Sequence, residues 1–240
     1  MLDVPWLLHS PWPWLPVTMA AYALALWIYR RSGALSLLIP VLTAASFVVA
    51  LLALFRIPYT VYASGTSVLG FLLGPATVAL AIPLYEQLGR LRQIWFPLTV
   101  ALLVGCVTAI LSAVAIGWSF GASLEMLMSL AAKSATMPIA IPVSERVGGV
   151  PALAALAVAV TGVAGAILAR PSLLDVLAIR DPAARGFSIG VTAHAIGMAR
   201  ELEHHPHAGA FAALGMGLNG IATALLVPVV VSVLPLAGLR

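Results

Sequence analysis

A charged residue inside an apolar stretch is the first candidate for chemistry in this sequence. Lys133 lies in the run Ser-Leu-Ala-Ala-Lys-Ser-Ala-Thr-Met-Pro, close to Ser134 and Thr136. A charged side chain near the centre of a bilayer costs about 2.5–3.5 kcal/mol, so a lysine in this position is expected to serve a function. The alternative is a lysine at the end of a half-helix whose side chain reaches the membrane interface.

A helix that begins just after Thr136 would contribute to the same site. Pro138 suits the first turn of a helix, and the N–H groups at a helix start attract anions. An ammonium group, two hydroxyls and a helix start together predict a site for a small carboxylate. The related stretch Gly74-Pro75-Ala76-Thr77 predicts a second helix end, which would place Pro75 and Thr77 on the opposite side of the substrate.

Two more polar side chains lie within apolar segments. His194, in Thr-Ala-His-Ala-Ile-Gly, is either a core imidazole bonded to a carbonyl or a substrate donor and proton carrier, since imidazole titrates near neutral pH. Asn219 is the only asparagine, and it either joins helices or binds substrate. In the substrate-binding hypothesis, both reach the hydroxyl or keto oxygen of the solute.

Other polar clusters do not indicate catalysis or metal binding. His204, His205 and His207 follow Glu201 and Glu203 without the spacing of a zinc-binding helix. The serine, histidine and aspartate residues show no spacing typical of a catalytic triad. We therefore expect no enzymatic activity, no metal and no cofactor.

Composition predicts that the outer surface of the protein faces lipid. Hydrophobic residues make up 62% of the 240 residues and charged residues 8%, whereas a soluble domain has roughly 25% charged residues. At about 20 residues per span, the chain holds about seven to nine membrane-deep elements. The net charge of +4 comes from scattered arginines, which excludes a basic face for nucleic acid. Cys106, in an apolar run, is expected to be a packing residue.

The predicted architecture is an all-α, polytopic membrane protein with two kinds of apolar segment. Residues 15–29, 34–55, 95–118, 151–169 and 208–234 are uninterrupted spans. Residues 57–87, 123–149 and 172–203 are interrupted in the middle by glycine and proline, and we expect discontinuous or re-entrant helices there. Non-helical backbone at membrane depth is tolerated only when it is buried in protein or lines a wet cavity. The interrupted segments therefore predict a solute site.

An internal repeat supports this organisation. Residues 77–89 align with residues 136–148, with identical Thr, Ala, Ile, Pro, Glu and Gly, and residues 105–111 align with 162–168. We therefore predict one membrane domain made of an N-terminal two-helix segment (1–56), repeat unit 1 (57–120), repeat unit 2 (121–170) and a third broken element with the last span (171–240). Broken elements that are hairpins would make the repeat units antiparallel, and elements that cross would make them parallel. The positive-inside rule favours crossing, which would place Arg90 and Arg146 on the same side.

Several motifs, in order along the chain, resemble the LrgB/CidB family, which includes YohK-type proteins and one half of the plastid glycolate/glycerate transporter. They are Leu73-Gly-Pro-Ala-Thr-Val-Ala-Leu-Ala81, Lys133-Ser-Ala-Thr-Met-Pro-Ile-Ala140, Thr161-Gly-Val-Ala-Gly165, His194-Ala-Ile-Gly-Met-Ala199 and Leu218-Asn-Gly220. Met137 and Met198 stand where many members have threonine, so no hydroxyl role transfers to those two positions. The resemblance implies a multi-pass protein of the bacterial inner (plasma) membrane that works with a small LrgA/CidA-like membrane protein.

The resemblance also implies two functions, and the residues favour the first. One is transport of small monocarboxylates such as glycolate, glycerate or pyruvate, and the other is holin/antiholin-like regulation of murein hydrolase export and autolysis. Lys133, Ser134, Thr136, Thr77 and Pro75 suit a compact anion, with Asn219 and His194 as further contacts and His194 as the candidate for proton coupling. A chain of this size is also expected to form a homodimer.

Overall fold

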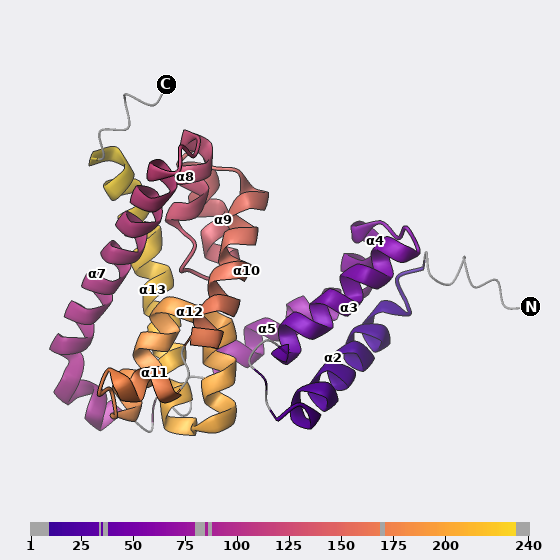
Figure 1. The fold of residues 1–240 in the computed structure, drawn as a ribbon, viewed down its shortest axis with the longest axis horizontal. Helices are drawn as coiled ribbons and strands as arrows, with labels where there is room; N and C mark the ends of the chain where they lie inside the picture. Colours follow the sequence, from indigo (N-terminus) through magenta and orange to yellow (C-terminus); the bar gives the residue numbers. More distant parts are fainter. Residues whose placement is uncertain are drawn as a thin grey trace, which may run out of the picture. The chain divides into compact units, whose positions relative to one another are not determined.

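The computed structural model describes residues 10–33, 35, 38–79, 85, 88–168 and 171–233 (Figure 1). All regular structure within these ranges is helical, which confirms the all-α prediction. The chain divides into two compact units, residues 1–79 and 80–240, each with its own internal packing.

The first unit contains helices that pack against its first described helix. Its described helices are α2 (Trp14–Arg31), α3 (Pro40–Leu54), α4 (Tyr59–Gly65) and α5 (Ser67–Ala79). The ring of Trp14 is fully buried and meets the ring of Tyr62 edge-on, with 5.9 Å between centroids. Thr18 Oγ1 donates a hydrogen bond to the Tyr62 hydroxyl at 3.2 Å. These contacts attach α4 to α2.

The second unit contains long helices with shorter ones between them. They are α7 (Leu88–Ser119), α8 (Leu124–Ala131), α9 (Met137–Arg146), α10 (Pro151–Leu168), α11 (Pro171–Val176), α12 (Pro182–His204) and α13 (Pro206–Val233). Within the described residues, α7, α10 and α13 are long and apolar enough to cross a membrane. Proline begins α10, α12 and α13, where its missing N–H costs nothing. The uninterrupted apolar segments predicted in this unit are therefore helices of membrane-spanning length, and α7 begins earlier than expected.

The helices α8 and α9 form a hairpin, named here the first hairpin. The hydroxyl of Ser123 caps α8 by accepting from Met126 N at 3.4 Å. The chain leaves helical geometry at residues 132–136, the first tip, and α9 begins at Met137. After α9, Val150 N donates to Ser129 Oγ at 2.8 Å. The chain just after α9 therefore lies beside α8, and the two helices run in opposite directions.

Helix α12 is also a hairpin, named here the second hairpin. His194 has φ 37° and ψ −131°, which is not helical. A Cβ on Gly197 would lie 2.7 Å from Ile189 Cγ2, whereas eight residues of straight helix would separate these positions by about 12 Å. The chain therefore folds back at residues 193–195, the second tip.

The bases of the two hairpins lie at opposite ends of the second unit. Leu127, near the base of the first hairpin, contacts Gly117, close to the end of α7. Asp181, at the base of the second hairpin, forms an ion pair with Arg90, close to the start of α7. Because α7 runs the length of the unit, the hairpins enter it from opposite ends. Figure 1 shows α8 and α9 at one end of the bundle and α11 at the other.

The second hairpin packs against α13 with its backbone in contact. A Cβ on Gly186 would lie 1.9 Å from Ala208 O, and a Cβ on Gly190 would lie 2.0 Å from Ala212 O. Only glycine allows this approach. Both pairs have the same sequence offset, so the first half of α12 runs parallel to α13.

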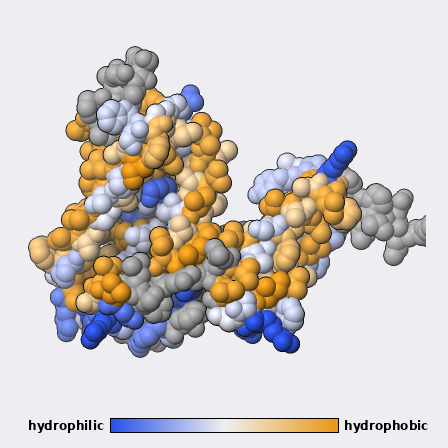
Figure 2. Space-filling view, in the orientation of Figure 1, coloured by the Kyte–Doolittle hydropathy of each residue, from blue (hydrophilic) through white to orange (hydrophobic). Residues whose placement is uncertain are grey.

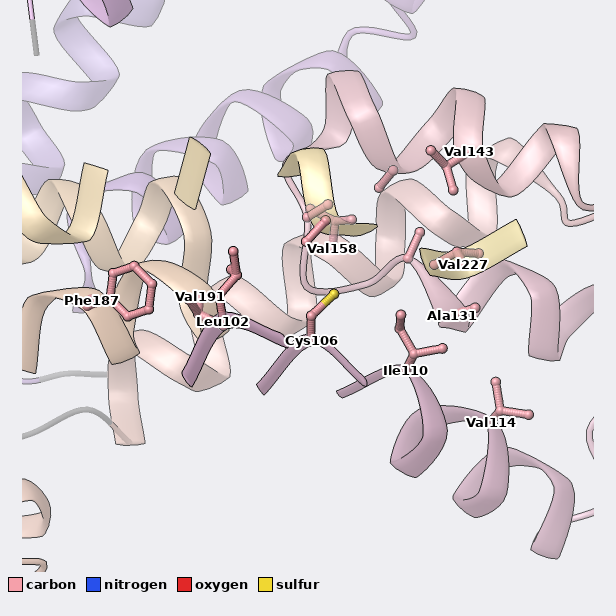
Figure 3. Close-up of a cluster of buried hydrophobic side chains, with 14 of the residues drawn as sticks. Leu102, Cys106, Ile110, Val114, Ala131, Val143, Val158, Phe187, Val191 and Val227 are labelled. Atoms are coloured by element: carbon pink, nitrogen blue, oxygen red, sulfur yellow. The ribbon is translucent and has the colours of Figure 1, made fainter. Parts of the chain in front are cut away.

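Apolar side chains fill the centre of the second unit. Figure 3 shows Leu102, Cys106, Ile110 and Val114, which are spaced four residues apart and lie on one face of α7. Cys106 is 1% exposed, and its Sγ lies 3.6 Å from Thr223 Oγ1 on α13. The prediction that Cys106 is a packing residue is confirmed.

The outer surface of the second unit is mostly apolar. Figure 2 shows hydrophobic residues over most of the visible face and hydrophilic residues gathered toward its lower end. Large apolar side chains of α7 such as Leu103, Val104 and Leu111 are exposed. Such a surface is suited to lipid and not to water.

The preference for broken elements that cross the unit is wrong. Segments 123–149 and 172–203 are hairpins, so Arg90 and Arg146 lie at opposite ends of the second unit. Helix α10 starts at the base of the first hairpin and therefore runs opposite to α7, the geometry that an inverted repeat would require. The division into repeat units 57–120 and 121–170 stays a prediction.

Candidate functional site

The tips of both hairpins meet halfway along the three long helices. Asn219, which contacts both hairpins, is the fourteenth of the 28 residues of α13. Val191, just before the second tip, faces Gly105, the eighteenth of the 32 residues of α7. His194 faces Val158, the eighth of the 18 residues of α10. Helices of this length match a bilayer, so in a membrane crossed by these helices the tips would lie near its centre.

The side chain of Asn219 joins the two hairpins. Its Nδ2 donates to Ser134 O at 2.9 Å and to Val191 O at 3.1 Å. The residue is 1% exposed. One amide group therefore connects the first tip, the second hairpin and α13.

The orientation of this amide follows from its partners. Both are carbonyl oxygens, which only accept, so the NH₂ group of Asn219 must face them and Oδ1 must face away. Oδ1 is buried and has no hydrogen-bond partner among the described residues. A buried acceptor without a donor costs free energy. Oδ1 is therefore available to a donor group on a ligand.

Lys133 provides a positive charge at the first tip. It is the only lysine in the chain, it is half-buried, and its Nζ donates to Ser134 Oγ at 3.4 Å. Ser134 is buried. No carboxylate of the described residues forms an ion pair with Lys133. The first tip lies at mid-length of α13, which favours a functional Lys133 over a lysine at the membrane interface, and both stay predictions.

The helix start predicted after Thr136 is confirmed, with fewer donors than expected. Thr136 is the N-cap of α9, is half-buried, and makes no side-chain cap bond. Pro138 has no N–H, while Ile139 N and Ala140 N both donate to Thr136 O, at 2.9 and 2.8 Å. The N–H groups of Thr136 and Met137 are the remaining donors at this helix start.

The imidazole of His194 is held against α10. The residue is 3% exposed, and its Nε2 lies 3.0 Å from Val158 O. Since a carbonyl only accepts, Nε2 carries a proton and Nδ1 is the acceptor in the neutral ring. A Cβ on Gly162 would lie 2.4 Å from His194 Cε1, so Gly162 makes room for the ring. This is the arrangement of a core imidazole bonded to a carbonyl, and a proton-carrying role stays a prediction.

Pro75 and Thr77 belong to the first unit, and the helix end predicted there is wrong. Helix α5 continues from Ser67 to Ala79 with Pro75 inside it. A proline inside an apolar helix is tolerated, so the Gly-Pro pair does not end the helix. Pro75 is exposed, and the side chain of Thr77 lies outside the described residues. Substrate binding by Pro75 and Thr77 stays a prediction.

The sequence did not indicate the backbone groups of this site. Val158 O and Val191 O accept the bonds that hold His194 and Asn219, and any residue type carries a carbonyl. Gly105 and Gly162 were the available indications, because both lie in the stretches that repeat along the chain. Over the described ranges, no group of three or more His, Cys, Asp or Glu residues gathers to hold a metal ion.

Comparison with known proteins gives the family. The sequence pattern of the LrgB-like family matches residues 18–233. The chain belongs to this family. No solved structure matches the chain.

Relatives are similar over nearly their whole length. The chain is 35% identical to the uncharacterized protein YxaC of Bacillus subtilis over 215 residues. This alignment covers 90% of this chain and 93% of YxaC. It is also 35% identical over 214 residues to an uncharacterized protein of Haemophilus influenzae, covering 89% and 92%. It is 28% identical over 220 residues to the antiholin-like protein LrgB of Bacillus cereus, covering 91% and 95%.

The family and the helices agree on the class of protein. LrgB-like proteins are membrane proteins with antiholin-like names among them, and the described residues include helices that can cross a membrane. The chain is therefore an all-α membrane protein of the LrgB-like family.

Proposed function

We propose that this protein is a secondary transporter of small monocarboxylates, such as glycolate, glycerate or pyruvate, in the bacterial inner membrane. One observation carries the proposal: the amide nitrogen of Asn219 bonds carbonyls of two hairpins that enter from opposite ends. Discontinuous helices that meet near the centre of the bilayer are typical of secondary transporters. A site between opposed hairpins can be opened to either side by moving one hairpin at a time.

The carboxylate of the solute binds at the first tip. Lys133 Nζ has no acidic partner among the described residues, and the hydroxyls of Ser134 and Thr136 lie within three residues of it. A hydrogen bond to a charged group contributes about 1.5–3 kcal/mol. An anion that bound here would neutralise a charge that is costly at this depth.

The second carbon of the solute faces α13 and the second tip. Asn219 Oδ1, which has no hydrogen-bond partner among the described residues, accepts a bond from a 2-hydroxyl group. His194 Nδ1 carries the coupled proton. The repeat in the sequence also assigns Thr77 and Pro75 to the solute.

A second candidate function comes from the relatives. Bacillus cereus proteins that are 28% identical are named antiholin-like protein LrgB, and this name supports a holin/antiholin-like regulator better than it supports a transporter. In that function, the chain assembles with a small LrgA/CidA-like membrane protein and regulates murein hydrolase export and autolysis. No substrate-binding lysine is required for it.

Reconstitution distinguishes the two functions. The full chain in proteoliposomes should take up labelled glycolate in a saturable manner, with competition by pyruvate and glycerate and stimulation by a proton gradient. Lys133→Met should lower uptake roughly 10- to 150-fold, the equivalent of one charge-assisted hydrogen bond. Thr99→Val, on an exposed face of α7, is the matched control and should not change uptake.

Other outcomes have defined meanings. Uptake that requires an added LrgA/CidA-like protein would make the complex the transporter. Leakage of large dyes without saturable uptake, unchanged by Lys133→Met, would refute the transporter and favour the antiholin-like function. The mass of the reconstituted particle would show whether the chain forms a homodimer.

A further inference from the structure

A groove leads from one end of the second unit toward the tips. It has a volume of about 440 Å³ and lies between α7 and the first half of α12. On α7 it follows one face, through Leu98, Ala101 and Gly105, and on α12 it passes Ser188 and Thr192. Its volume falls within the range of small-molecule sites, about 300–1,000 Å³.

The inner end of the groove reaches the candidate site. Gly105 and Val191 line it there, and Val191 O is the carbonyl that Asn219 Nδ2 holds at 3.1 Å. A side chain larger than glycine at position 105 would extend toward Val191, because a Cβ there would already lie 3.4 Å from Val191 Cγ1. Val191 therefore lines the groove with its side chain and contacts Asn219 with its carbonyl.

An ion pair between Asp181 and Arg90 lies at the mouth of the groove, and Asp181 is also held by backbone N–H groups. Asp181 is fixed by α12, since its Oδ1 accepts from Ala183 N at 2.9 Å and from Ala184 N at 3.0 Å. Its Oδ2 pairs with Arg90, and the two side chains are 43% and 48% exposed. A surface pair of this exposure is weak. Arg90 can therefore exchange the carboxylate of Asp181 for that of a solute.

The arginines identify the side to which the groove opens. In the described part of the second unit, Arg90, Arg92, Arg180 and Arg185 lie at the end that holds the mouth, Arg200 lies on the returning half of α12, and Arg146 lies at the opposite end. Arginine and lysine are concentrated in cytoplasmic loops. The mouth of the groove therefore faces the cytoplasm.

We propose that this groove is a water-filled path along which a small anion moves between the cytoplasm and the tips, and that Arg90 attracts the anion at the mouth. The identity of the anion as a carboxylate rests on the proposed function, but the path itself does not. The apolar residues between the mouth and Ser188 give the anion no strong partner, so it is not trapped before it reaches Lys133.

Single cysteines test whether water enters the groove. The chain has one cysteine, so Cys106→Ser gives a cysteine-free protein and keeps a hydroxyl near Thr223. Into it we would introduce Ala101→Cys or Ser188→Cys in the groove, and Thr99→Cys as the control on another face of α7. Each is treated in inside-out and right-side-out vesicles with a charged, membrane-impermeant methanethiosulfonate.

Water in the groove predicts a clear difference between these variants. Ala101→Cys and Ser188→Cys should react at least about tenfold faster than Thr99→Cys, because a thiol must ionise in water to react. The reaction should occur from the cytoplasmic side, in inside-out vesicles. Equal rates for Ala101→Cys and Thr99→Cys, or a reaction from the outer side only, would overturn the proposal. A reactive groove without glycolate uptake would refute the transporter and leave the path intact.

A pair of charge changes tests the mouth. Arg90→Gln should raise the KM for anion export from the cytoplasmic side about tenfold at low ionic strength, with less effect at 0.15 M salt. Asp181→Asn should lower this KM, because asparagine still caps α12 and leaves Arg90 unpaired. If neither variant changes KM, Arg90 does not recruit the anion. Wild-type melting temperatures for both variants would exclude a folding defect as the cause.

Discussion

Replacing Asn219 with leucine tests whether one amide holds the two hairpins together. Leucine keeps the same branched arrangement of heavy atoms, with methyl groups larger than the amide atoms, and removes the NH₂ group, which leaves Ser134 O and Val191 O without their donor. Side-chain hydrogen bonds between membrane helices contribute about 0.6 kcal/mol on average and about 1.7 at most. Loss of both bonds should therefore lower the free energy of unfolding by about 1–3 kcal/mol.

Thermal unfolding in detergent micelles measures this change. For a chain of this length, 1 kcal/mol corresponds to roughly 2–4 °C in Tm, so Asn219→Leu should melt about 2–12 °C below the wild type. The six tryptophans provide the fluorescence signal. Ser112→Ala is the control, because the exposed hydroxyl of Ser112 bonds only within its own helix, to Ala109 O at 3.3 Å.

A second substitution separates the loss of donors from the loss of shape. Asn219→Asp has the same shape, but at neutral pH its carboxylate can only accept and would face two carbonyl oxygens. It should therefore be less stable than Asn219→Leu at pH 7 and recover as the pH falls and the carboxyl group gains a proton. An Asn219→Leu chain that melts within a degree of the wild type would refute the idea that this amide joins the hairpins.

Two further predictions concern the packing of the hairpins. Gly190→Val should prevent correct folding, because its Cβ would lie 2.0 Å from Ala212 O. Gly217→Ala, on the outer face of α13, meets nothing within 4 Å and should fold normally. A monodisperse, stable Gly190→Val protein in size-exclusion chromatography would contradict the contact. Ser129→Ala leaves the N–H of Val150 without its 2.8 Å acceptor and should lower the unfolding free energy by about 1–3 kcal/mol; an unchanged Tm would show that this bond does not close the first hairpin.

The position of each break in the second unit could be predicted from the sequence. Lys133 and Pro138 in one apolar run, and His194 among small residues in another, interrupt what would otherwise be continuous helices. Both interruptions are present at the expected residues. A charged or polar group at this depth must have a partner or a cavity, so its position is informative even without a structure.

The path of the chain between the breaks could not be predicted. A hairpin and an interrupted crossing helix have the same composition, and the choice depends on contacts such as that between Val150 N and Ser129 Oγ, 21 residues apart. In the first unit, Pro75 lies inside a continuous helix, so a Gly-Pro pair alone does not indicate a break. Local sequence contains neither kind of information.

The sequence predicts part of the role of Asn219, but not which groups it contacts. As the sole asparagine, within an apolar span, it is predicted by the sequence to join helices or to bind substrate. Its partners are backbone carbonyls 85 and 28 residues away. No residue type marks such carbonyls, so only the fold shows that one side chain serves both hairpins.

The opposite directions of the two hairpins bear on the direction of flow. Each side of the membrane meets a similar device, a short pair of half-helices that ends near the centre of the bilayer. For the transporter proposed above, the hairpins themselves favour neither import nor export, because one hairpin enters from each end of the unit, although the groove described above opens at one end only. The concentration gradients of solute and coupled ion would set the direction, and the same protein would release a waste acid in one growth condition and recover it in another.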